Sequence, residues 1–135
     1  MRVVVDTNVL VEGLKRKGPC GAVVDGWVAK IFEPCVSTAL ALEYEDVLTR
    51  NRSPEEQERM RRVLQALLHR ALFVPIVFTY RPQSPDAGDD FIIDCAMNAQ
   101  AGLVTSNTRH FRGAAERLWF PLLTPEQFVK ALQEQ

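Results

Sequence analysis

Residues 3 to 11 read VVVDTNVLV, and this stretch decides how the chain can fold. Three consecutive valines are typical of a strand buried on both faces, as in a parallel sheet covered by helices on both sides. We expect a strand over Arg2–Asp6 and a helix from about Val9. Ligands of open parallel sheets bind outside the carboxyl ends of the strands, so the Asp6 carboxylate is placed to meet a metal ion or a substrate. The alternative is that Asp6 only caps the next helix.

The rest of the chain alternates between short apolar runs and segments with helical periodicity, which is typical of βα units. Further strands are expected at 31–37, 71–78, 102–106 and 118–123, and further helices at 21–30, 39–50, 54–70, 90–101 and 124–135. Residues 80–90, rich in Pro, Gly, Ser and Asp, are expected to form a loop, and residues 108–118 a mixed loop and short helix. The pattern predicts one domain over residues 1–135, a three-layer α/β/α sandwich with a central parallel sheet of four to five strands.

Several residues mark the ends of these elements. Ser37 is expected to cap the helix over 39–50, and Asp89 or Asp90 the helix that begins near residue 90. Thr124 and Gln127 have the spacing of a capping box at the last helix. Pro75 removes a backbone donor, so the strand over 71–78 is expected at a sheet edge.

The composition limits the class of protein. The chain has 135 residues and a net charge of −1, so any site for a polyanion needs a local basic patch. Its three cysteines are far apart and form no CxxC pair, which argues against a disulfide framework and a zinc site, and favours a reducing cytoplasmic compartment. No apolar run of about 18 residues is present, so we expect no membrane association.

Four polar side chains are expected at the same end of the sheet. Asp6 ends the first strand, Glu43 lies on the helix after the second, Asp90 begins the helix before the fourth, and Asn107 follows the fourth. Carboxylates that converge repel each other unless a cation neutralises them, so such a cluster favours a hard divalent ion with oxygen ligands, Mg²⁺ or Mn²⁺. Zinc is less expected because no histidine or cysteine has ligand spacing here.

Each of these positions has a structural alternative. Glu43 could be a solvated helix residue, although Leu40 and Val47 place it on the inward face. Asp90 could be only a helix cap, and Asn107 a turn residue with positive φ.

Four segments together resemble the signature segments of the PIN-domain nucleases, especially the branch of toxins related to the VapC type. They read VVVDTNVLV (3–11), VSTALALEYEDVL (36–48), DDFIIDCAMNAQA (89–101) and LVTSNTRHF (103–111). The resemblance implies an α/β/α fold and metal-dependent hydrolysis of RNA phosphodiester bonds. It also implies an antitoxin partner, a homodimer, and the following roles: Asp6, Glu43 and Asp90 coordinate Mg²⁺ or Mn²⁺, Thr7 or Asn8 braces the Asp6 loop, and Thr105 supports the site.

The chain departs from this pattern at Asn107, where many members of the family have a fourth aspartate. An amide keeps its hydrogen bonds but adds no charge, so lower metal affinity is expected, with Asp94 as a candidate for partial compensation. His110, in the same segment, is expected to be structural or to face the substrate.

RNA phosphates are held mainly by Arg and Lys. Arg109 and Arg112, close in sequence to the site, are expected to contact them. Arg50 and Arg52 begin a second group of arginines, for which the alternative is the solvated face of a helix balanced by acids.

Two other functions are compatible with acids at strand ends. One is a PIN-like module for RNA binding or dimerisation that has lost catalysis, which Asn107 would explain. The other is an aspartyl-phosphate domain, which needs a lysine near the nucleophile. None of the four signature segments contains a lysine, so this alternative ranks last.

Overall fold

The computed structural model describes residues 1–16, 18–80 and 87–135. Its elements, in chain order, are β1 (Arg2–Val5), α1 (Thr7–Leu14), α2 (Gly18–Val28), β2 (Glu33–Val36), α3 (Thr38–Thr49), α4 (Pro54–Leu68), β3 (Leu72–Phe73), α5 (Ala87–Ala99), β4 (Gly102–Val104), α6 (Thr108–Leu118), β5 (Leu122–Leu123) and α7 (Pro125–Gln133).

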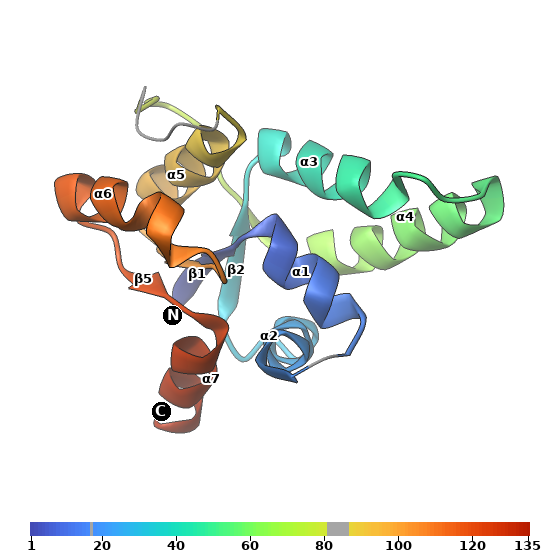
Figure 1. The fold of residues 1–135 in the computed structure, drawn as a ribbon, viewed down its shortest axis with the longest axis horizontal. Coiled ribbons are helices and arrows are strands. Elements are labelled where there is room, and N and C mark those ends of the chain that lie inside the picture. The colour runs from blue at the N-terminus through green and yellow to red at the C-terminus, as the bar shows by residue number, and fades with distance from the viewer. Residues whose placement is uncertain (17, 81–86) are drawn as a thin grey trace.

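The five strands form one sheet in the order β3-β2-β1-β4-β5, and every neighbouring pair is parallel. Helices α1 to α4 lie on one side of this sheet, and α5 and α6 lie on the other (Figure 1). The predicted three-layer α/β/α fold is therefore confirmed. The three valines of β1 are at most 1% exposed, as expected for a strand with helices on both faces.

The order of the strands fixes where a site can form. The chain runs outward from β1 through β2 to β3, and then returns to the other side of β1 to add β4 and β5. The direction of winding therefore reverses between β1 and β4. In open α/β sheets the crevice at such a reversal, outside the carboxyl ends of the two strands, is where ligands bind.

Several expected boundaries are confirmed. Ser37 caps α3 and accepts a hydrogen bond of 3.2 Å from the Leu40 N–H. Thr124 and Gln127 form both hydrogen bonds of a capping box at α7. β3 lies at a sheet edge, as predicted from Pro75, but it ends at Phe73, so the proline follows the strand.

Other expectations were wrong. Asp89 and Asp90 do not cap α5, because this helix begins at Ala87 and both acids lie in its first turn. The first helix begins at Thr7, directly after Asp6. Residues 108–118 form a continuous helix, α6, because Phe111 and Ala114 bury one side of it. Part of the predicted loop, residues 81–86, lies outside the described residues.

The described part of the chain bears on two earlier expectations, membrane crossing and disulfide bonds. None of its helices combines the length and the apolar character that crossing a lipid bilayer requires. Its three cysteines, Cys20, Cys35 and Cys95, are free thiols.

Candidate active site

Asp6 lies at the carboxyl end of β1, where the winding of the sheet reverses. It has the backbone position of the N-cap of α1, yet its side chain makes no capping hydrogen bond. Its backbone N–H donates to the Val104 carbonyl at 2.9 Å, and its Oδ2 accepts from Thr105 Oγ1 at 2.7 Å. The residue is 7% exposed. Since the carboxylate faces the residues after β4, the alternative that Asp6 is only a cap does not hold.

Thr105 joins the ends of the two central strands. Its side chain is fully buried, donates to Asp6 Oδ2, and accepts a hydrogen bond of 3.0 Å from the Asn107 N–H. One hydroxyl therefore serves as both donor and acceptor and fixes the Asp6 carboxylate relative to the chain that enters α6. The resemblance implied that Thr105 supports the site, and that functional role stays a prediction.

Glu43 is brought to the same end of the sheet by α3. Leu40, Tyr44 and Leu48 form the buried side of this helix, and Glu43 is half-buried next to it. Glu43 Oε2 accepts a hydrogen bond of 2.7 Å from Thr7 Oγ1. A carboxylate held by a buried threonine is not a freely solvated helix residue, so the structure favours the inward position expected for Glu43.

Burial changes the pKa of the Asp6 carboxyl. The pKa of the Asp6 carboxyl is raised from 3.8, mainly because burial disfavours the charged form. Hydrogen bonds from Thr105 and the Thr7 backbone oppose this rise, the Glu43 carboxylate adds to it, and His110 lowers the pKa. A buried carboxyl beside a second acid is a favourable place for a cation, which would stabilise the charged form.

Two of the three acids of α5 are also buried. Asp90 is 5% exposed and Asp94 is 2% exposed. Asp94 Oδ1 accepts a hydrogen bond of 2.9 Å from the Tyr80 N–H, so it fixes the segment that follows β3 to α5. Over the described residues, no group of three or more His, Cys, Asp or Glu side chains lies close enough together to hold a metal ion. Metal coordination by Asp90 and Asp94 with Asp6 and Glu43 stays a prediction.

Asn107 contacts His110, and His110 contacts α5. Asn107 has a φ of −117°, so it is not the positive-φ turn residue of the alternative. Its Nδ2 lies 3.0 Å from His110 Nδ1, and the same ring nitrogen lies 3.6 Å from Asp89 Oδ2. The Asp89–His110 contact joins the first turns of α5 and α6. Sequence reasoning missed it, although both residues belong to its signature segments.

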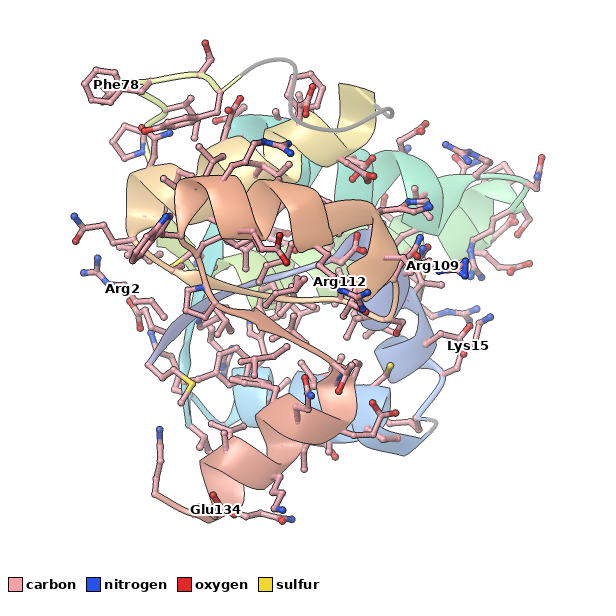
Figure 2. The ribbon with its side chains drawn as sticks, turned by 60° about the vertical axis from the view of Figure 1, so that its left-hand side comes forward. Arg2, Lys15, Phe78, Arg109, Arg112 and Glu134 are labelled. Atoms are coloured by element: carbon pink, nitrogen blue, oxygen red, sulfur yellow. The ribbon has the colours of Figure 1, made fainter. Side chains whose placement is uncertain are left out.

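The arginines fall into two groups. Arg50, directly after α3, lies 2.5 Å from Asp46 of that helix, and Arg52, in the connection to α4, lies 3.4 Å from Glu56 of α4. Arg109 and Arg112 are exposed on α6 and form no ion pair with any residue that the structure describes. Both are labelled on α6 in Figure 2, which also labels Lys15 at the end of α1. Arg109 and Arg112 therefore have their charge available for a ligand.

Thr7 and Asn8, the two predicted braces of the Asp6 loop, differ. Thr7 is buried and its hydroxyl is used on Glu43, whereas Asn8 is exposed. The Thr7 side chain thus connects the turn after β1 to α3, and a bracing role for Thr7 or Asn8 at the Asp6 loop stays a prediction.

A comparison with protein families matches residues 2–109 to the model of the PIN domain. The chain belongs to the PIN domain family. This confirms the resemblance seen in the four sequence segments, and the match includes Asp6, Glu43, Asp90 and Asn107. No curated protein matches the chain.

Solved structures with the same fold include the following three. A structure of VapBC2 from Rickettsia felis bound to a promoter DNA fragment has a TM-score of 0.65 and 15% identity, over 92% of this chain and 98% of that one. FitAB bound to the IR36 DNA fragment gives 0.67 and 18%, over 91% and 94%. FitAcB from Neisseria gonorrhoeae gives 0.63 and 15%, over 92% and 98%. At these identities the likeness establishes the fold alone.

Proposed function

We propose that this PIN domain is a metal-dependent endoribonuclease and the toxin of a toxin-antitoxin pair. One observation carries the proposal. Two carboxylates, each accepting a hydrogen bond from a threonine hydroxyl, lie at the end of the sheet where its winding reverses. Asp6 is held by Thr105 and Glu43 by Thr7, each at 2.7 Å. Two acids from distant parts of the chain are thus fixed at the place where a parallel sheet binds its ligands.

The donor chemistry of the site fits Mg²⁺ or Mn²⁺. The side chains on offer are carboxylates, which hard divalent ions prefer, and Asp6 is a buried acid whose raised pKa a cation would reverse. In this proposal Asp6, Glu43 and Asp90 hold the ion, and Asp94 contributes from the next turn of α5. The bound ion would supply positive charge that stabilises the negative charge developing on the phosphate during hydrolysis.

The protein's own residues would orient the acids and bind the substrate. Thr105 and Thr7 fix the directions of the Asp6 and Glu43 carboxylates. Arg109 and Arg112, which are not neutralised by acids, would hold the RNA phosphates near the start of α6. Arg50 and Arg52 were predicted to do the same, but their ion pairs with Asp46 and Glu56 make them weaker candidates.

The proposed partners follow from the fold and the structures that share it. VapBC2 and FitAB are complexes solved with DNA fragments. Because the chain resembles the VapC-type toxins, we propose that it binds a cognate antitoxin protein. We also propose that it forms a homodimer and acts in the cytoplasm. Expression of the chain should then arrest growth, and the antitoxin encoded beside it should relieve the arrest.

A second function is favoured by two observations. Asn107 replaces an acid that many members of the family have, and the described residues contain no group of three metal-binding side chains. A catalytically weak module for RNA binding or dimerisation would have the same fold with these features.

The two functions differ in turnover. Purified protein is incubated with labelled single-stranded RNA and Mn²⁺, beside Asp6→Asn prepared in the same way to exclude a contaminating nuclease. The nuclease proposal expects cleavage by the wild type, none without the metal, and a loss of at least about 100-fold in Asp6→Asn. RNA binding without any cleavage by the wild type would favour the binding module.

A further inference from the structure

Two consecutive residues of α3 contact the two residues that flank Asp6. Tyr44 donates a hydrogen bond of 2.5 Å from its hydroxyl to the Val5 carbonyl. Glu43 accepts from Thr7 Oγ1 at 2.7 Å. Asp6 lies between these two contacts, and its own N–H is held by Val104 from the opposite side at 2.9 Å. Backbone and side-chain hydrogen bonds thus fix three consecutive residues at the end of β1.

The Tyr44 hydroxyl is not needed to fill the core. Its side chain is fully buried, and its ring makes an edge contact with Trp27 at a centroid distance of 6.4 Å. A phenylalanine ring would pack in the same space. A buried hydroxyl needs a partner, however, and the partner present is the carbonyl directly before Asp6.

The phenol stays protonated and can only act as a donor to Val5. Burial raises the pKa of Tyr44 well above 10.0, and the neighbouring Cys95, Asp6 and Glu43 add to this rise.

We propose that Tyr44 is a positioning residue, whose hydroxyl fixes the end of β1 and thereby aims the Asp6 carboxylate. This inference rests on the proposed function for its catalytic consequence, but not for its structural one. Functional side chains must be held within about 0.5 Å of their working position, usually by residues that do not touch the ligand. Tyr44 meets this description: it contacts the backbone beside Asp6 and is closed off from solvent.

The test is Tyr44→Phe, which removes one oxygen and keeps the ring. Ser37→Ala is the matched control, because it removes one hydroxyl from the same helix, where Ser37 caps α3. Three readouts are measured on both variants and the wild type: hydrogen exchange of the Asp6 and Thr7 amides, the affinity for Mn²⁺ by isothermal titration calorimetry, and kcat and KM for RNA cleavage.

In Tyr44→Phe we expect the Asp6 and Thr7 amides to exchange about 5- to 10-fold faster, the loss that one hydrogen bond implies. Mn²⁺ affinity and kcat should fall by a similar factor, with KM within about 2-fold of wild type because substrate contacts are untouched. Ser37→Ala should speed exchange at the start of α3 and lower the melting temperature, and leave all three quantities at Asp6 unchanged.

Unchanged exchange at Asp6 in Tyr44→Phe contradicts the inference. So does an equal effect of Ser37→Ala, which would make the response a general loosening of α3, and so does failure of Tyr44→Phe to fold. A wild type that neither cleaves RNA nor binds Mn²⁺ contradicts the proposed function, whereas the exchange data still decide whether Tyr44 positions Asp6.

Discussion

Thr7 Oγ1 donates a hydrogen bond of 2.7 Å to Glu43 Oε2, and this contact connects the turn after β1 to α3. We predict that Thr7→Val reduces RNA cleavage by about 10-fold, because Glu43 loses the donor that orients it, and costs about 1 to 2 kcal/mol of stability. Thr7→Ser keeps the hydroxyl and should restore activity. Thr49→Val removes a comparable hydroxyl, which donates to the Glu45 carbonyl of the same helix. If it lowers cleavage as much as Thr7→Val, the contact to Glu43 is not the cause.

Thr105 has two hydrogen-bond partners, so its loss should cost more. Thr105→Val leaves both Asp6 Oδ2 and the Asn107 N–H without this partner in a buried place. We expect the free energy of unfolding in urea to fall by about 1 to 3 kcal/mol at pH 7. Thr105→Ser, which keeps the hydroxyl, should lose less. Equal losses in the two variants would show that the methyl group, and not the hydroxyl, matters.

The raised pKa of Asp6 predicts how stability depends on pH. A folded state with the higher pKa holds its proton where the unfolded chain has lost it, so this group lowers stability as pH rises from about 3.9 through the folded pKa. Asp6→Asn should therefore melt at a higher temperature than the wild type at pH 7.5 in EDTA, and the difference should shrink toward pH 4. The exposed Glu134→Gln is the control, and a pH-independent difference for Asp6→Asn would contradict the burial argument.

Arg109 and Arg112 of α6 should contribute to RNA binding more than the paired Arg50 and Arg52, which lie between α3 and α4. In the Asp6→Asn background, which prevents cleavage, Arg109→Ala or Arg112→Ala should weaken binding and reduce the slope of log K against log salt by about 1. Arg50→Ala, which already has its charge paired with Asp46, should change neither quantity. Fluorescence anisotropy of a labelled RNA measures both. Equal effects of all three variants would place the RNA elsewhere or more diffusely.

Asn107→Asp restores a charge that the site lacks. We expect it to tighten Mn²⁺ binding by about 5- to 10-fold, which corresponds to about 1 kcal/mol between charges near 4 Å in a solvated site. Asn51→Asp adds the same charge in the exposed connection between α3 and α4 and should leave Mn²⁺ affinity unchanged. Calorimetric titration separates the two. Weaker binding in Asn107→Asp would show that the Asn107 amide is used in another way, such as its contact with His110.

The buried strand β1 and the starts of two helices could be predicted because they depend on residues that are close together in the sequence. Three valines followed by Asp6 place a buried strand and its carboxyl end, and Ser37 and Thr124 are caps that act within three residues. The position of Glu43 followed from its neighbours one helical turn away. These inferences need only the periodicity of a helix or a strand.

The contacts that hold the site were less predictable because they join distant elements. Nothing near Tyr44 in the sequence shows that its hydroxyl bonds Val5, and the contact between His110 and Asp89 depends on how α5 and α6 pack. Thr7 was expected to brace the Asp6 loop, but which partner it takes is set by the approach of α3. The caps proposed at Asp89 and Asp90 failed because both acids lie inside the first turn of α5.

The most direct test of a metal centre at this end of the sheet is an anomalous difference map from a crystal soaked in Mn²⁺. We predict a peak at about 2.1 Å from oxygens of Asp6 and Asp90, with Glu43 on the same side of the ion. A map with no peak beside Asp6 at full Mn²⁺ saturation, or an ion bound only by acids elsewhere on the surface, would contradict the account.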